Sequence, residues 1–477
     1  MRILLHGFGT FALIWRHLIA HAQKVAPEIE WSIILQTDHH RDVLRAVLPD
    51  ERIFCLEHHQ ARESALGLDL SVLATYPGNI HADIEAEKVA FKHQAARLQL
   101  ARAVETYTLY KEFAERVRPT HLLISQIEGF EGKMLTGLGR ELGLTVMVPV
   151  NGRNLGGTFF ASDAYETLPA HRAATPELLD RARAFVARFR ESPTSAAGRP
   201  DDPAADGTVL STFRPSLPVR AARFARRAIS RPDLFDREHL RTSVLNNLPF
   251  LRNRMWALHR WRAARIFDIA SPDALPKRFI YYPLQYTPES SINTPAPYYV
   301  DQLRVIDALR FAMPHDHLLV VKEHPACIVV RPLSFVKALQ QRAGVVLTQY
   351  RMDSRMLARR ASLTVSVSGS ATLEAFLFGK PALMLGHSFI TPYLGGASAV
   401  SALQERIAGA IAAPPDDEQV ANAVAEVMSV TYPFMLSAPG LPDEPVLRPG
   451  NIARMFDAVR DHATRAAAHA GHAARAA

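Results

Sequence analysis

The sequence predicts an α/β protein with two facing, doubly wound domains, each built on a mostly parallel sheet. Short apolar stretches alternate with helical ones over residues 1–165 and again over residues 277–462, and this alternation is typical of βαβ units. The chain of 477 residues is too long for one ordinary core. Its 48% hydrophobic and 21% charged content is that of a globular protein. We therefore expect two Rossmann-like domains joined by a helical region.

The N-terminal domain, 1–165, begins with the apolar run RILLHG and a glycine turn. Residues 132–142 have apolar side chains at helical spacing, which predicts a helix between two strands. The long polar segment 82–116 predicts another helix. The expected strands are 2–9, which ends in a glycine turn, 31–37, 52–56, 122–125 and 145–150, and the first helix runs through residue 20.

The C-terminal domain, 277–462, repeats this alternation. Its strands are predicted from β-branched apolar runs and its helices from the 3.6-residue period. The expected strands are 279–283, 317–325, 344–350 and 364–367, with one more opened by Pro381. The expected helices are 298–312, 335–342, 352–360, 372–378 and 417–428.

Residues 166–276 form the region between the two domains. A helix is expected at 174–192, followed by the Pro-, Ala-, Gly- and Asp-rich linker 193–207. Arginine recurs through residues 214–278, where much of the net charge of +8 lies. This stretch predicts either a surface for an anionic lipid or polymer, or a pair of solvated basic helices. Because no nucleic-acid-binding module accompanies the charge, we expect no nucleic-acid partner.

The cysteines and the two ends of the chain suggest a compartment. Cys55 and Cys327 lie far apart in the sequence, so no disulfide framework is expected and a reducing cytoplasm is favoured. The N-terminus lacks the cleavage site of a signal peptide, and no apolar run is long enough to cross a bilayer. The Ala-, His- and Arg-rich tail, 463–477, suggests no function, because His469 and His472 alone make a weak metal site.

A phosphate-binding turn is predicted in TVSVSGSATLEAFLFGKPALML, residues 364–385. Gly379 fits the end of the helix there, and Pro381 opens the next strand. The backbone N–H groups and hydroxyls between the first strand and the helix suit a phosphate. The alternative is an ordinary turn in which Ser370 caps the helix. The candidate phosphate ligands are Ser368, Gly369, Ser370 and Thr372.

Two other strand ends of this domain also carry polar groups, in VVKEHP and in the loop that begins at Gln285. Carboxyl ends of parallel strands share one edge of the sheet, where α/β proteins bind ligands. His324 alone is more often structural, but beside a phosphate it can donate to an oxygen of the leaving group. Glu374 is either an exposed helix residue or a ligand of ribose hydroxyls. The candidate nucleotide-binding residues are Gln285, Lys322, Glu323, His324, Pro325, Ser368, Gly369, Ser370, Thr372 and Glu374.

The corresponding edge of the N-terminal domain carries acidic residues. Glu128 and Glu131 lie in EGFEG, between a strand and a helix, where a carboxylate can act as a general base. The alternative for Glu131 is stabilisation of the helix N-terminus. Asp163 is another candidate base. Asn151 and Arg153 follow the next strand and are candidate acceptor contacts. The candidate catalytic residues are therefore Glu128, Glu131, Asp163 and His324.

Residues 277–390 contain five motifs whose order and spacing resemble those of a known family. This is the family of bacterial capsule polysaccharide synthesis and export-locus glycosyltransferases, which includes Kdo transferases. EGFEGK and its neighbours resemble it more loosely. The motifs are FIYYPLQYTPESS (279–291), VDQL (300–303), VVKEHP (320–325), RPLSF (331–335) and VSVSGSATLEAFLFGKPAL (365–383).

The resemblance implies a GT-B-like fold and transfer of a sugar, such as Kdo, from a CMP-sugar to a glycan or glycolipid acceptor. It also implies that His324 and the Ser368, Ser370 and Thr372 cluster bind the nucleotide phosphate. An acidic residue of the N-terminal domain would deprotonate the acceptor, since EGFEG is similar to the motif that supplies the base in GT-B sialyltransferases. A single phosphate needs no metal, so neither a metal nor a cofactor is expected. The expected location is the cytoplasm, at the inner face of the bacterial inner membrane if the basic stretch 214–278, which the resemblance does not cover, contacts anionic lipid.

Three alternatives remain open from the sequence. The chain resembles, in its HP motif, polyol-phosphate transferases that use CDP-glycerol. A UDP-sugar transferase or epimerase of the same fold is a second alternative. A non-catalytic glycan- or lipid-binding component of a polysaccharide export machine is the third, and His324, Ser368 and Ser370 argue against it because a degenerate site would not need them.

Overall fold

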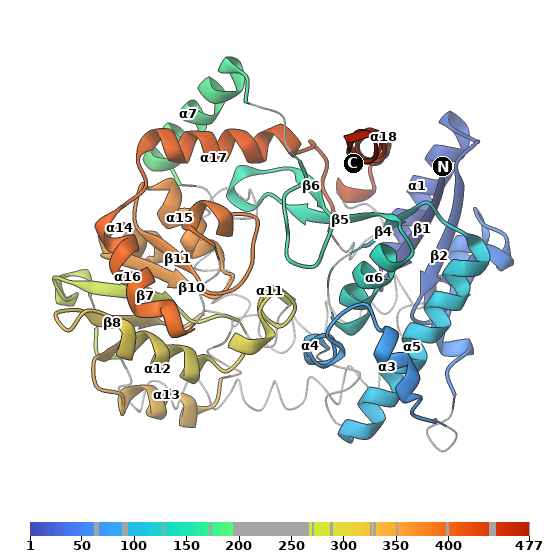
Figure 1. The fold of residues 1–477 in the computed structure, drawn as a ribbon. Helices are drawn as coiled ribbons and strands as arrows, with labels where there is room; N and C mark the ends of the chain where they lie inside the picture. Colours follow the sequence, from blue (N-terminus) through green and yellow to red (C-terminus); the bar gives the residue numbers. More distant parts are fainter. Residues whose placement is uncertain are drawn as a thin grey trace, which may run out of the picture.

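The computed structural model places the chain in two lobes (Figure 1). The predicted arginine-rich insertion falls almost wholly outside the described residues, as do Glu128 and Pro325. The structure describes residues 1–61, 66–87, 94–125, 127, 129–170, 174–193, 267–269, 271–286, 290–324, 327, 331–349, 352–396, 400–437 and 445–476.

The N-terminal lobe is built on a six-stranded sheet with the order β3-β2-β1-β4-β5-β6. Its first five strands are parallel, and Leu35 of β2 lies opposite Cys55 of β3. Because β1 lies beside β4, the topological switch point of this sheet falls between them. The strands are β1 (Arg2–Gly7), β2 (Glu30–Leu35), β3 (Ile53–Cys55), β4 (His121–Leu123), β5 (Thr145–Asn151) and β6 (Thr158–Ala161).

Strand β6 was not predicted, and it runs antiparallel to β5. Gly156 and Gly157 have φ angles of 75° and 67°, which turn the chain back on itself. At Gly157 a Cβ would lie 2.8 Å from the carbonyl oxygen of Tyr432, so only glycine fits there. The sequence signal of β6 is a run of 4 residues behind a glycine turn, which is too short to distinguish from a loop.

Helices cover both faces of this sheet. The single helix expected over 82–116 is wrong, because α4 (Ile80–Ala86) and α5 (Ala96–Val117) are separate. Asn79 caps α4 by accepting from two backbone N–H groups, and Glu87 is extended and ends it. Helices α5 and α6 (Gly129–Glu141) bury Tyr110 and Phe130 on one face, and α1 (Phe11–Val25) buries Trp15 on the other.

The C-terminal lobe contains a five-stranded parallel sheet with the order β11-β10-β7-β8-β9. Its first and fourth strands, β7 and β10, are neighbours, as β1 and β4 are in the other lobe. The predicted fold class, two Rossmann-like α/β domains, is therefore confirmed. The strands are β7 (Phe279–Pro283), β8 (Leu318–Lys322), β9 (Val345–Thr348), β10 (Leu363–Ser366) and β11 (Ala382–Met384).

Helices also cover both faces of the second sheet. In the part of the chain that the structure describes, none of the helices has the length and hydropathy needed to cross a bilayer. The helices of this lobe are α11 (Ser290–Asn293), α12 (Gln302–Ala312), α13 (Leu333–Gln340), α14 (Ser354–Arg360), α15 (Ser370–Leu377), α16 (Leu403–Ala412) and α17 (Asp417–Val430).

The last part of the chain returns to the N-terminal lobe. Helix α18 (Pro449–Ala476) buries Ile452, Met455, Phe456 and Val459 against α1. This i, i+3, i+4, i+7 spacing gives α18 one apolar face. The packing thus assigns α18 to the first lobe, whereas the sequence suggested a C-terminal domain over 277–462. Helix α7 (Pro176–Glu191), from the predicted linker region, contacts α17 of the second lobe.

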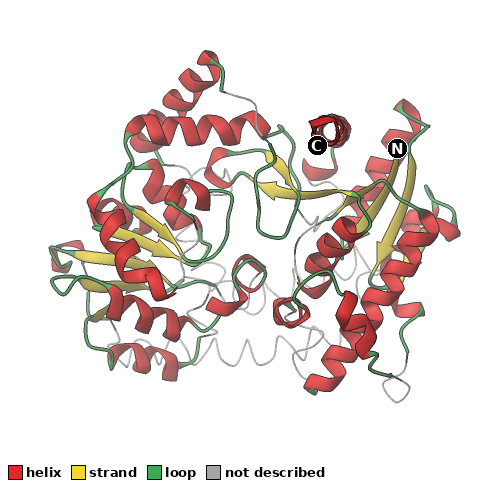
Figure 2. Cartoon of the chain, in the orientation of Figure 1, coloured by secondary structure: helices red, strands yellow, loops and turns green. Residues whose placement is uncertain are grey.

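Segments that follow strand carboxyl ends connect the two lobes. Arg153, after β5, donates to Ser388, after β11, at 3.0 Å. Asn293, in the segment after β7, donates to the Glu85 carbonyl oxygen of α4 at 3.4 Å. The strands of the C-terminal sheet point toward the other lobe (Figure 2). Segments at the carboxyl edges of the two sheets therefore contact each other, and these edges are where this fold class binds its ligands.

Candidate active site

The N-terminus of α15 lies at the switch point of the C-terminal sheet, directly after β10. Gly369 is the N-cap residue, with an extended backbone, and no side chain caps the helix. The alternative in which Ser370 caps α15 is wrong, because Ser370 is the first helical residue. An N-terminus without a side-chain cap leaves backbone N–H groups for an anion, and the helix dipole favours negative charge there.

Gln285 lies against this turn from the neighbouring strand. A Cβ at Gly369 would lie 3.0 Å from the side-chain nitrogen of Gln285 and 3.1 Å from its oxygen. Gln302 holds the Gln285 backbone from both sides, accepting from its N–H at 2.6 Å and donating to its carbonyl oxygen at 3.2 Å. Arg331 donates to the same carbonyl oxygen at 2.9 Å. Gln285 is therefore a fixed part of the turn's surroundings.

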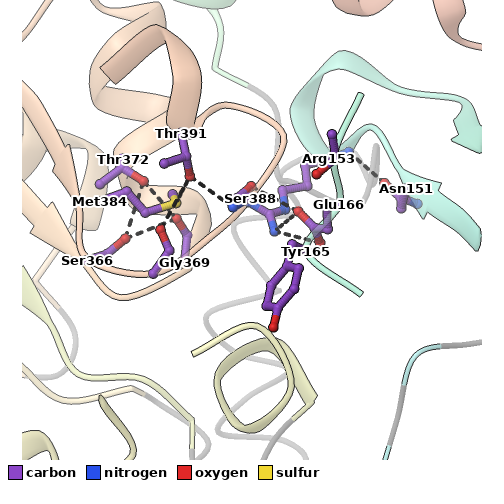
Figure 3. A network of polar contacts seen from close by, with 12 residues as sticks. Asn151, Arg153, Tyr165, Glu166, Ser366, Gly369, Thr372, Met384, Ser388 and Thr391 are labelled. Atoms are coloured by element: carbon purple, nitrogen blue, oxygen red, sulfur yellow. Dashed lines mark hydrogen bonds and ion pairs between the residues drawn. The ribbon is translucent and has the colours of Figure 1, made fainter. Parts of the chain in front are cut away.

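The other residues of the turn differ in what they can offer a ligand. The Thr372 hydroxyl is fully buried and donates to the Gly369 carbonyl oxygen at 3.0 Å, with Ser366 Oγ at 3.3 Å. This geometry favours a role for Thr372 in shaping the turn. Ser368 is 1% exposed, whereas Gly369 and Ser370 are partly exposed at the edge. Figure 3 shows the Ser366, Gly369 and Thr372 contacts.

Glu374 lies one turn into α15. It is 8% exposed, so the alternative of an exposed helix residue is wrong. Gly379, just past the end of the helix, has a φ of 68°, which confirms the predicted glycine end of α15. Arg190 of α7 donates to the Leu377 carbonyl oxygen at 2.8 Å and satisfies that end of the helix.

Lys322 and Glu323 of the KEHP motif are occupied by protein partners. Lys322 donates to Ser354 at 2.9 Å. Glu323 is 1% exposed, and it accepts from Arg331 Nε at 2.5 Å and from the His324 backbone N–H at 2.7 Å. Burial raises the pKa of the Glu323 carboxyl, and Arg331 opposes that rise. Both residues thus shape the strand end from which His324 projects.

His324 is the one exposed residue of this strand end among those described. Partial burial of its ring and the nearby Lys322 and Arg331 cations lower the pKa of the imidazole to about 4. Solvent reaches the ring and screens the two cations, but all three causes favour the neutral form at pH 7. Neutral imidazole can donate one hydrogen bond to a phosphate oxygen. The Tyr286 ring lies 5.6 Å from the His324 ring and flanks it.

Glu131 occupies the switch point of the N-terminal sheet. Its carboxylate is 6% exposed and accepts from Tyr110 at 2.7 Å and from Gln36 at 3.0 Å. His6 Nε2 lies 3.6 Å from the same carboxylate. Ser125, after β4, lies 3.5 Å from the other nitrogen of His6. The structure thus brings a buried acid, a histidine and a hydroxyl together beside β1 and β4.

The residues around Glu131 were not identified from the sequence. Gln36, His6 and Ser125 all lie at or just beyond the carboxyl ends of β2, β1 and β4. The rule that ligands bind at these ends, applied to every predicted strand, would have selected them. Tyr110 has no such signal, because it lies in the middle of the long helix α5. The predicted base Glu128 lies outside the described residues.

Asp163 and Asn151 organise turns. The Asp163 carboxylate accepts from the backbone N–H groups of Tyr165 at 2.9 Å and Thr167 at 3.2 Å. The Asn151 side chain accepts from the Arg153 N–H at 2.7 Å. These bonds give both residues a local structural role, and their predicted roles in catalysis and acceptor binding stay predictions.

Arg153 joins the two lobes (Figure 3). Its guanidinium donates to Glu166 at 2.9 Å and to Ser388 at 3.0 Å, and Ser388 donates to Glu166 at 2.9 Å. Its charge also lies over the Phe389 ring, 5.3 Å from the centroid. The geometry therefore favours a clamp between lobes over a free anion-binding side chain.

Comparisons with known proteins find similarity only to solved structures. No protein-family model matches the chain, and no curated protein matches it. The β-Kdo 2,4 transferase KpsC of Thermosulfurimonas dismutans is 13% identical, with a TM-score of 0.35 over 64% of this chain and 79% of that one. The UDP-GlcNAc 2-epimerase of Neisseria meningitidis is 11% identical, with a TM-score of 0.27 over 90% of this chain and 98% of that one. At these values the likeness assigns no donor, acceptor or residue role.

Proposed function

We propose that this protein is a glycosyltransferase that binds a nucleotide sugar, specifically a CMP-sugar, at the carboxyl edge of its C-terminal sheet. The observation that carries the proposal is the N-terminus of α15, which lacks a side-chain cap and lies at the switch point beside the side-chain amide of Gln285, a residue whose backbone is fixed. The sugar would pass to a glycan or glycolipid acceptor bound on the N-terminal lobe.

The proposed nucleotide site extends over three neighbouring strands. The order β10-β7-β8 places the α15 turn, Gln285 and His324 side by side along one edge. Two strand spacings separate the outer members, which is about 10 Å. In this arrangement the α15 N–H groups and Ser370 hold the phosphate, while His324 donates to an oxygen that gains charge as the sugar departs. A donor aimed at developing negative charge lowers the barrier to bond cleavage.

The proposed acceptor half centres on Glu131. A base must take the proton of the attacking hydroxyl. The Glu131 carboxylate is held by Tyr110 and Gln36, which fixes its position, and His6 Nε2 lies 3.6 Å from it. Glu128, three residues earlier in the EGFEG motif, is the second candidate for this role.

Calorimetric binding of CMP, CDP and UDP tests the proposal. We expect CMP to bind most tightly, and we expect His324→Ala and Ser370→Ala each to weaken CMP binding while leaving the fold intact. His315→Ala is the matched control, because the exposed His315 precedes the opposite, amino end of β8. Preference for UDP would favour a UDP-sugar transferase or epimerase, and preference for CDP a polyol-phosphate transferase. Failure to bind any of the three would overturn the proposal.

A further inference from the structure

Asp38, Cys55 and His58 converge at the carboxyl edge of the N-terminal sheet. Cys55 is the last residue of β3, and strand register places it opposite Leu35 of β2. Asp38 follows β2 in one short turn, and His58 ends the turn Leu56–His58 after β3. One ligand atom from each lies within 4.8 Å of the other two. Among the described residues this is the one group of three side chains with metal-ligating atoms so close together.

Acidic groups surround the buried Cys55 sulfur. The side chain is buried, and the carboxylates of Asp38 and Glu57 lie near it. A divalent cation at the sulfur would be attracted by both carboxylates.

The cationic side chain of Arg41 contacts two of the three ligand side chains. Its Nη1 lies 3.0 Å from His58 Nδ1 and 3.8 Å from Asp38 Oδ1, and its Nη2 lies 3.5 Å from Asp50. Metal binding through His58 Nε2 requires a proton on Nδ1, which would then face the Arg41 donor. Arg41 must therefore turn away toward Asp50 when the site fills.

We propose that Cys55, His58 and Asp38 bind a zinc-class divalent cation, with the fourth position open to water. Sulfur, imidazole and carboxylate together suit Zn²⁺ and Co²⁺, because hard cations such as Mg²⁺ prefer oxygen alone. The site lies away from the proposed nucleotide edge and does not depend on the proposed function.

The distances support tetrahedral binding after a small contraction. Ligand atoms on one tetrahedral zinc lie about 3.3–3.8 Å apart, from bond lengths of about 2.0–2.3 Å. His58 Nε2 and Asp38 Oδ1 are already 3.4 Å apart. Both side chains are partly exposed, at 38% and 49%, so they can move toward the buried sulfur. Two exposed ligands also leave room for a water molecule in the fourth position.

Cobalt titration of the full-length, untagged and reduced protein tests the site. We expect one Co²⁺ per chain and an intense near-ultraviolet charge-transfer band from sulfur to cobalt, which Zn²⁺ then abolishes. This band identifies a thiolate ligand, so binding to surface histidines cannot imitate it. Cys55→Ser should lose the band, and Cys327→Ser, which removes the buried cysteine of the other lobe, should keep it.

Two further variants replace partly exposed residues, so they test the site without disturbing the fold of the lobe. His58→Gln should weaken Co²⁺ binding by more than about tenfold, since even outer-sphere changes cost about that much. Arg41→Gln should tighten binding, because it removes the competing cation. Absence of the band in the wild type, a band that survives in Cys55→Ser, or unchanged affinity in His58→Gln would overturn the proposal.

Discussion

Arg153 of the N-terminal lobe and Ser388 of the C-terminal lobe are 235 residues apart in sequence and joined by a hydrogen bond of 3.0 Å. Glu166 accepts from both of them, so one carboxylate ties the two lobes together. The contact lies where the carboxyl edges of the sheets approach each other. Its strength therefore bears on the stability of the whole molecule as well as on the site.

Arg153→Ala should lower stability by about 1–3 kcal/mol, because it leaves the Glu166 carboxylate without its charged donor. Ser388→Ala should cost less, about 1 kcal/mol, since it removes a neutral donor. Chemical denaturation measures both. If Arg153 is instead an acceptor ligand, R153A will raise the KM for the acceptor and leave the unfolding midpoint unchanged.

Gly369→Ala should abolish tight nucleotide binding with little loss of stability. The backbone of Gly369 has a φ of −76°, which alanine adopts freely, but its Cβ would displace the Gln285 amide at 3.0 Å. We expect CMP affinity to fall by more than tenfold, about 1.4 kcal/mol. Gly409→Ala is the matched control, because Gly409 lies in the middle of α16 with nothing within 4 Å of its Cβ position. That variant should gain roughly 0.5–1 kcal/mol of stability and bind CMP normally.

Glu131→Gln should reduce kcat by about 10²–10⁴-fold if Glu131 is the base. Glutamine keeps the shape and can still accept from Gln36, so the fold should survive. The control is a second glutamate of α6 that accepts a hydrogen bond from a tyrosine of α5. At the far end of α6, Tyr107 donates to Glu141 at 2.7 Å. Glu141→Gln should leave kcat unchanged. Equal activity of both variants would move the role to Glu128, and Glu128→Gln would then be the inactive one.

Stability should fall as the pH drops from about 6.5 toward 4, in part because of His462 of α18. Burial against the lobe lowers the pKa of His462 to about 4, and its ring lies 5.2 Å from Phe160. The unfolded chain therefore takes up a proton near pH 6.5 that the folded chain takes up only near pH 4. The stabilisation is complete above pH 6.5 and is lost as the pH falls through that window, by at most about 1.4 kcal/mol per pH unit.

Denaturation midpoints measured across this range check the sign. His462→Gln should flatten the dependence, whereas His315→Gln, at an exposed loop position, should not. A wild-type protein that gained stability on acidification between pH 6.5 and 4 would contradict the assignment to His462.

The full-length protein should sediment with anionic vesicles at low salt and be released at about 1 M salt, where the Debye length is about 3 Å. The motivation is the arginine-rich stretch 214–278. Arg226→Glu with Arg227→Glu should weaken the binding. Arg304→Glu with Arg454→Glu, two exposed arginines elsewhere, controls for net charge. Equal loss in both double variants, or no sedimentation of the wild type, would exclude this region as a membrane contact.

The sheets could be predicted from the sequence because each strand carries its own local signal. Strand β7 has the predicted bounds, Phe279–Pro283, and β10 differs by one residue at each end. Where the signal was not local, prediction failed. The break between α4 and α5 depends on the Asn79 cap, and β6 depends on two glycines and on the backbone of Tyr432.

The candidate site was predictable only in part, for a related reason. A strand-end rule can find Gln285, His324 and Glu131, since each follows its own strand. It cannot show that the Thr372 hydroxyl donates to the Gly369 carbonyl oxygen, or that Arg153 donates to Glu166 and Ser388. Those partners depend on which segments fold against each other across long stretches of sequence.

The return of α18 to α1 also has a consequence for synthesis on the ribosome. The apolar face of α1 that meets Phe456 and Val459 is made before the second lobe, and its partner is made after that lobe. The first lobe therefore remains incomplete while the second lobe, which contains all its own strands, emerges and can fold. Emergence of α18, and not the emergence of the first sheet, should set the moment at which the N-terminal lobe becomes resistant to protease.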